Sequence, residues 1–139
     1  MTTNLITDKS TGRVLARHVT AEEWEKGGLV FHSEDGDFLQ VGTWGYNSGK
    51  RLFAHTHNDV PRTITRTHET LYVRRGRIEA RIFDEKRELV ATLEVKEGDL
   101  LTLMSGGHGY TILDDGTQVL EIKNGPYVGA DADRVRFES

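Results

Sequence analysis

The sequence predicts a small all-β domain, an antiparallel sandwich or barrel. Short runs of alternating polar and apolar residues follow one another from residue 29 to residue 123. Turn sequences rich in Gly, Asp and Ser separate these runs, and fifteen glycines supply them. Only one segment carries a helix signal. Many short strands at near-regular spacing are typical of sandwiches and barrels, and 139 residues suffice for one domain.

The first elements are a strand at about Val14–His18 and a short helix. The sequence Thr20-Ala-Glu-Glu23 matches a capping box, in which Thr20 caps the Glu23 amide and Glu23 reaches back. It predicts a helix of about two turns that ends at Gly27–Gly28, a natural C-terminal stop.

The remaining runs predict the strands of the main β-domain. They are 29–32, 37–46, 51–57, 63–74, 77–83, 89–95, 99–104, 108–113 and 117–123. The tail adds a candidate edge strand at Arg134–Phe137. We therefore expect a single domain, with residues 1–36 as an N-terminal strand and helix extension packed on a barrel formed by residues 37–139.

Composition limits the classes of function. The net charge is −4 and the pI is near 5.8, which argues against a nucleic-acid or anionic-membrane binder. The absence of cysteine excludes disulfides, thiolate metal sites and a Cys nucleophile. No apolar run has the length of a signal peptide or a membrane span. We expect a soluble cytoplasmic protein.

Two histidines and a glutamate mark a candidate site. In a strand His55 and His57 point to the same face, so two imidazoles can meet at one point. Glu69 shares a strand face with Leu71 and Val73, which places a carboxylate on the apolar side. Burying that carboxylate is costly unless it is paired or bound to a cation.

A third histidine, His108, follows a glycine turn and alternates with Tyr110 and Ile112. Three imidazoles and one carboxylate from separate strands are a plausible ligand set for a divalent transition metal. His18 and His32 have no other candidate ligands at a matching spacing, and we expect them on the surface or in loops.

The spacing of these residues resembles the two motifs of the cupin superfamily. In the first motif, five residues separate Gly49 from His55-Thr-His57, and six residues separate Glu69 from Gly76. In the second, Gly98 is followed after five residues by Met104-Ser-Gly106, then His108 and Ile112. The resemblance covers residues 37–123 and implies a jelly-roll β-barrel.

This chain departs from the family pattern at three places. Eleven residues separate His57 from Glu69, where the family has three or four. Met104 and Ile112 replace the family's Pro and Asn, and one residue before His108 is missing. The insertion also makes His68 an alternative ligand, although strand alternation points it away from the face of Glu69.

The resemblance implies one divalent metal ion, with Fe favoured over Mn, Ni and Zn, held by His55, His57, Glu69 and His108. It implies a metal-dependent enzyme acting on a small polar molecule, with an Fe(II) oxygenase favoured. Alternatives are an isomerase, epimerase or lyase of cupin type, for instance on a sugar or nucleotide sugar, and a non-catalytic small-ligand binder. Small cupins also suggest a homodimer.

Residues beside the predicted ligands are candidate substrate contacts, and no catalytic residue is assigned among them. Arg62 and Arg66 flank the insertion and suit a carboxylate or phosphate. The other candidates are His68, Tyr110 and Lys123. The sequence leaves open whether the face of the last strand that carries Glu121 and Lys123 lines a cavity or meets solvent.

Overall fold

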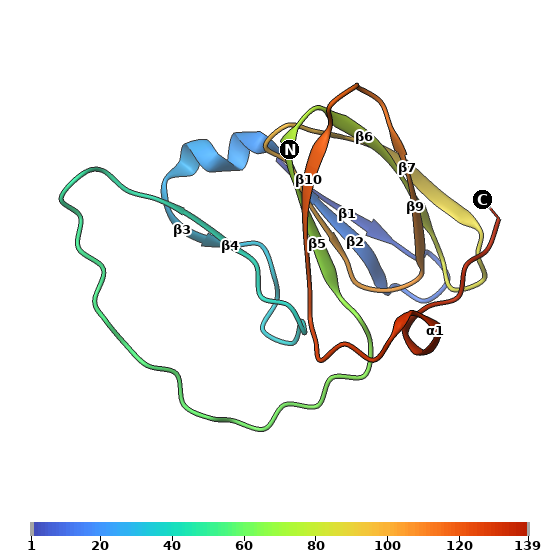
Figure 1. Cartoon of the computed structure of the whole chain (residues 1–139), viewed down its shortest axis with the longest axis horizontal. Coiled ribbons are helices and arrows are strands. Elements are labelled where there is room, and N and C mark those ends of the chain that lie inside the picture. The colour runs from blue at the N-terminus through green and yellow to red at the C-terminus, as the bar shows by residue number, and fades with distance from the viewer. Residues whose placement is uncertain (1, 139) are drawn as a thin grey trace.

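Two antiparallel sheets, packed face to face, form the body of the protein (Figure 1). A computed structural model describes residues 2–138. Its elements in chain order are β1 (Thr3–Thr7), β2 (Val14–Val19), the 3₁₀ helix η1 (Ala21–Lys26), β3 (Gly28–Phe31), β4 (Gly42–Gly45), β5 (Glu69–Arg75), β6 (Arg77–Phe83), β7 (Leu89–Lys96), β8 (Leu100–Leu103), β9 (Gly107–Ile112), β10 (Gln118–Lys123) and α1 (Ala130–Asp133). The predicted all-β class is confirmed.

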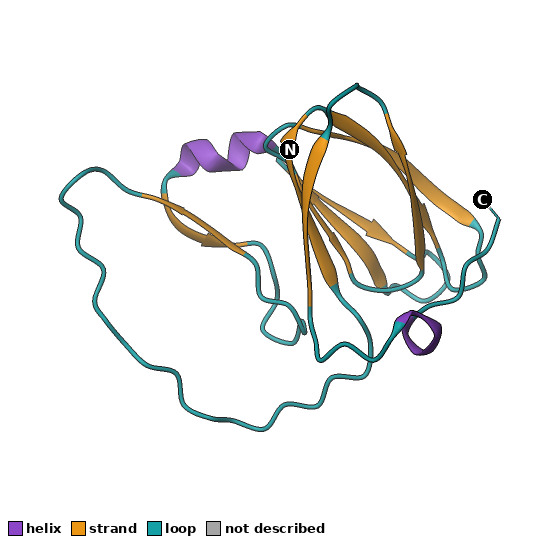
Figure 2. Ribbon diagram, viewed as in Figure 1, coloured by secondary structure: helices purple, strands orange, loops and turns teal. Residues whose placement is uncertain are grey.

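The large sheet has the strand order β1-β2-β8-β5-β10, and the small sheet has the order β7-β6-β9. Neighbouring strands in both sheets are antiparallel. A separate hairpin, β3-β4, lies beside the large sheet (Figure 2). The two sheets do not close into a barrel, because β9 and β10 end their sheets without a further strand partner among residues 2–138.

The core lies between the inner faces of the two sheets. Alternation along β5 buries Leu71 and Val73, which pack with Leu101 of β8 and with Ile78 and Ile82 of β6. These side chains are almost fully buried, and each contributes about 1.5–3 kcal/mol of burial free energy. The predicted period-2 pattern of β5 is therefore the pattern that fills the core.

The outer face of the large sheet is covered by η1 and by the segment around the β3-β4 hairpin. Trp24 of η1 packs edge-on against Tyr72, with ring centroids 6.1 Å apart. The ring of Phe38 lies against His68 at 4.8 Å. These contacts cover the outer face of the large sheet around β5.

The predicted helix is present as η1, but the predicted capping box is wrong. Thr20 makes no side-chain capping bond, and the carboxylate of Glu23 binds Thr2 and Lys26 instead. Asp99 Oδ1 accepts the Ala21 amide at 2.8 Å, so a distant carboxylate caps the helix. The predicted stop at Gly27 is confirmed, with φ at 63°.

Several predicted strands are wrong or shorter. Residues 46–68 form a loop, so the expected strand at 51–57 and the first half of 63–74 are absent. The predicted strand 37–46 is reduced to β4. Residues 134–137 are irregular, although Phe137 packs on Phe83 at 5.2 Å. Strand formation requires a partner edge, and none of these segments has one.

The turn between β5 and β6 depends on Gly76. Its φ is 81°, and an added Cβ would lie 2.9 Å from the Cα of Thr117. A side chain at this position would be strained by both its backbone conformation and its neighbour.

In the described part of the chain, no helix has the length and apolar character needed to cross a membrane.

A buried ionisable pair ties η1 to the large sheet. His18 Nε2 lies 2.9 Å from Asp99 Oδ2, and both side chains are buried. Asp99 also accepts the backbone amides of Ala21 and Lys96. Burial raises the pKa of Asp99, but these hydrogen bonds outweigh it and hold the pKa below its ordinary value. The sequence-based placement of His18 at the surface is wrong.

We predict that Asp99→Ala lowers the free energy of unfolding by about 2–4 kcal/mol, because three donors lose their acceptor. Asp99→Asn, the matched control, keeps the size and loses the charge. Since the folded pKa is depressed, the advantage of Asp over Asn is present above about pH 4 and is lost as the pH falls through the folded pKa. Urea unfolding across pH measures both effects. Equal stability of wild type and Asp99→Ala would contradict this role.

Candidate functional site

The inner face of β5 carries the predicted carboxylate to the edge of the core. Glu69 is the first residue of β5 and is buried. It shares its face with Leu71 and Val73, while Thr70 points to the other face and bonds Thr102 Oγ1 at 2.9 Å. The predicted inward orientation of Glu69 is confirmed.

His108 of β9 supplies the partner of this carboxylate from the opposite sheet. His108 Nε2 lies 2.6 Å from Glu69 Oε1. The register of β9 with β6 places His108 opposite Ile82 and Tyr110 opposite Ala80, so both face the core. The contact therefore bridges the two sheets.

Glu121 and Lys123 of β10 complete the cluster. In the antiparallel register Lys123 is opposite Glu69, and Glu121 is opposite Leu71. Both thus lie on the face of β10 that continues the inner face of β5. Both are solvent-exposed, because β10 is the last strand of its sheet.

The carboxyl groups of Glu69 and Glu121 interact, and this interaction displaces their pKa values in opposite directions. Burial raises the pKa of Glu69, but the interactions with His108 and Glu121 outweigh it and bring the pKa below the ordinary value. The interaction with the Glu69 carboxylate, together with partial removal of the side chain from water, raises the pKa of Glu121. One carboxylate is thus kept ionised while its neighbour retains a proton more readily.

The hydroxyl of Tyr110 is buried beside this pair and has no hydrogen-bond partner among the described residues. Burial, together with the negative charges of Glu69 and Glu121, raises the pKa of Tyr110, so the phenol stays protonated. Its ring lies 5.4 Å from that of His108. A neutral O–H donor is therefore held at the carboxylate pair.

His55 and His57 lie elsewhere in the chain. They belong to the loop 46–68, which extends away from both sheets (Figure 1). Their rings lie 5.0 Å apart, and both residues are exposed. Within residues 2–138, no three His, Asp or Glu side chains are grouped so as to hold one ion. The structure brings together Glu69 and His108, and the four-ligand set stays a prediction.

The remaining predicted contacts are spread over the same loop. Arg62 and Arg66 are exposed, and Arg62 reaches only the Val60 carbonyl at 3.4 Å. His68 is buried against Phe38, and burial lowers its pKa. Its ring thus packs on the segment between β3 and β4, whereas Glu69 contacts β9.

Sequence reasoning missed a second group of buried polar residues, on the outer face of the large sheet. His32, expected in a loop or at the surface, is 7% exposed and bonds Thr43 Oγ1 at 2.9 Å. Arg17 and Glu23 are buried near it. Alternation along β2 could have flagged Arg17, but no local signal identifies its partners.

Comparison with known proteins adds no relative: no family model, no curated protein and no solved structure matches this chain.

We predict that Tyr110→Phe raises the free energy of unfolding by about 1 kcal/mol, because it removes a buried hydroxyl that has no partner. Chemical denaturation measures the difference. Tyr72→Phe is the matched control, since Tyr72 lies on the outer face of the same sandwich. A destabilised Tyr110→Phe protein would show that the hydroxyl has a partner in solution.

Proposed function

We propose that this chain is a divalent-metal-dependent enzyme that acts on a small polar molecule, with Fe(II) oxygenase chemistry favoured. The observation that carries the proposal is the Glu69–His108 contact across the two sheets, 2.6 Å long and flanked by Glu121, Tyr110 and Lys123. Carboxylate and imidazole are the ligands that such metals share.

The two other proposed ligands, His55 and His57, are within reach of the site. The eleven residues between His57 and Glu69 span up to roughly 36 Å when extended. Lys50 and Arg51 make this part of the loop basic. The side of the sandwich where β9 and β10 end their sheets carries Glu69 and Glu121. We propose that the loop folds back there, supplies both imidazoles and closes a jelly-roll barrel of the cupin type.

In this proposal each residue of the cluster has a distinct task. The bound metal would supply Lewis-acid or redox chemistry. Glu69 and His108 would hold the ion, while Tyr110 would donate a hydrogen bond and Lys123 would bind an anionic substrate group. Arg62 and Arg66 would arrive with the loop and clamp a carboxylate or phosphate.

Metal content tests the proposal directly. Untagged protein is expected to bind about one Fe(II), Mn(II), Ni(II) or Zn(II) ion per chain, measured by elemental analysis after dialysis. His55→Ala, His57→Ala and Glu69→Ala should each weaken binding at least about 100-fold, because each removes a ligand. Uptake of oxygen by the iron form with candidate substrates then separates an oxygenase from an isomerase or lyase.

His68→Ala is the matched control, because its imidazole lies against Phe38. It should keep both the metal and the β-rich circular dichroism spectrum. If wild-type protein takes up none of the four ions, metal dependence is refuted. Loss of metal in His68→Ala would show that the ligand set is wrong.

A second candidate function is metal-free acid–base catalysis, and the neighbouring carboxyl groups of Glu69 and Glu121 on the inner face favour it. Two carboxylates with pKa values displaced in opposite directions provide a base and an acid at one site, with His108 as a relay. This arrangement suits isomerase, epimerase or lyase chemistry on a polyhydroxylated substrate.

The two candidates differ in how Glu121→Gln and chelation act. Metal-free catalysis predicts that chelated protein keeps its activity and that Glu121→Gln, which removes the proposed acid, loses the alkaline limb of its pH–rate profile. Because the folded pKa of Glu121 is raised, its stabilising contribution is present at low pH and is lost as the pH rises through that pKa. The melting temperature of Glu121→Gln relative to wild type should therefore rise with pH. Glu94→Gln, in β7, is the control.

A further inference from the structure

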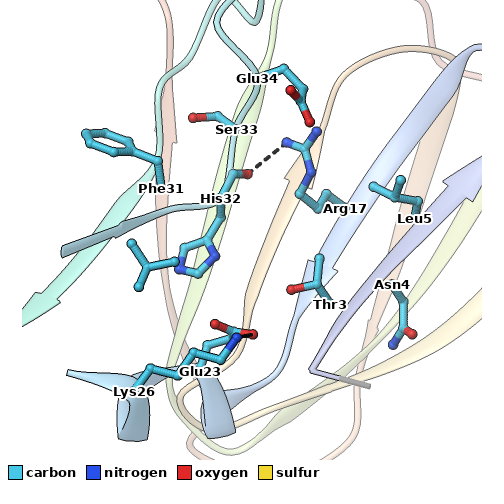
Figure 3. A pocket seen from close by; sticks show the side chains of 11 residues that line it. Thr3, Asn4, Leu5, Arg17, Glu23, Lys26, Phe31, His32, Ser33 and Glu34 are labelled. Atoms are coloured by element: carbon cyan, nitrogen blue, oxygen red, sulfur yellow. Dashed lines mark hydrogen bonds and ion pairs between the residues drawn. The ribbon is translucent and has the colours of Figure 1, made fainter. Parts of the chain in front are cut away.

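A cavity of about 610 Å³ lies on the outer face of the large sheet, on the side opposite Glu69 and His108. Figure 3 shows it between the strands β1 and β2 on one side and the segment that follows β3 on the other. Its volume is in the range of small-molecule sites. Four of its lining residues carry polar or charged side chains that the proposal uses: Arg17, Glu23, Lys26 and His32.

Arg17 places a buried cation in this cavity. The residue is 6% exposed, and its Nη1 donates to the carbonyl of His32 at 2.8 Å and to Asp37 Oδ2 at 3.2 Å. Within residues 2–138, neither Nε nor Nη2 is engaged in a hydrogen bond. Donor capacity therefore remains on a guanidinium whose position is already fixed.

Glu23 places a buried anion in the same cavity. It is 4% exposed, and its Oε1 accepts hydrogen bonds from Thr2 and from Lys26 Nζ. Its Oε2 is buried and has no partner in the part of the chain that the structure describes. A buried carboxylate oxygen without a donor is costly, and a ligand that supplies the donor would remove that cost.

The wall between the two charges is formed by the His32 ring and by apolar side chains. The His32 ring is held by Thr43, and burial lowers its pKa, so near neutral pH the ring adds no positive charge. Leu5, Val30 and Phe31 supply the apolar surface. Glu34 and Arg17 lie at one end of the cavity, and Glu23 and Lys26 lie at the other (Figure 3).

We propose that this cavity binds a small zwitterion, an ω-amino acid or a close analogue, whose carboxylate pairs with Arg17 at one end and whose ammonium group pairs with Glu23 at the other. A simple anion would leave Glu23 Oε2 without a donor, and a simple amine would leave the free guanidinium edge unused. Only a ligand that carries both groups supplies a hydrogen-bond donor to Glu23 and an acceptor to Arg17. This site is separate from the Glu69–His108 cluster and independent of its function.

Amide NMR shifts test the proposal on the intact chain. ω-Amino acids of increasing chain length, from β-alanine to 6-aminohexanoic acid, are titrated singly, and at least one is expected to give saturable shifts at Arg17, Glu23 and His32. The best binder is then compared with its deaminated acid and its decarboxylated amine. Each of these should bind roughly tenfold or more weakly, because one charge-assisted pair is lost.

Arg17→Gln and Glu23→Gln should each cause a similar loss of affinity. Arg13→Gln and Glu22→Gln are the matched controls, since they make the same charge changes at exposed positions. Circular dichroism checks that each variant is folded, and the wild-type comparison of zwitterion, acid and amine stands if one variant is not. The proposal is overturned if no amino acid gives saturable shifts, or if acid or amine alone binds as tightly as the zwitterion.

Discussion

The inner face of β5 is the constraint on which the rest of the structure depends. The pleat that buries Leu71 and Val73 in the core also turns Glu69 inward. A carboxylate in that position needs a partner, and His108 of the opposite sheet provides it at 2.6 Å. The polar site and the apolar core are therefore products of one strand, and the site cannot be displaced without shifting the core.

Sequence patterns predict this part of the molecule because its determinants are local. Period-2 alternation identifies β5 and β9, and Gly76 marks a turn that requires a positive φ. The capping box at Thr20 fails because Asp99, far along the chain, takes the helix amide. The buried positions of His18 and His32 likewise depend on distant partners, which a local pattern cannot reveal.

The loop 46–68 shows why alternation alone does not make a strand. Residues 51–57 have the pattern of a strand, but β-structure requires an edge with which to pair. The outer edges of β9 and β10 have no strand partner among residues 2–138, and β10 exposes Leu120 and Ile122. Unpaired edges with exposed aliphatic side chains are where added strands are stabilised most. These unpaired edges and exposed side chains are the physical reason why we expect the loop to add a strand there and to bring His55 and His57 close to Glu69.

The large sheet also fixes the position of Glu69, on its inner face, relative to Arg17, on its outer face. On its inner face Glu69 is paired in register with Leu103, and one residue away, on the outer face, Arg17 and Thr70 flank Thr102. Because Leu101 and Leu103 of β8 are locked in the core, neither cluster can move along its strand. In the proposed metal site Glu69 and His108 are therefore already positioned, and the entropic cost of assembly would fall on the loop 46–68.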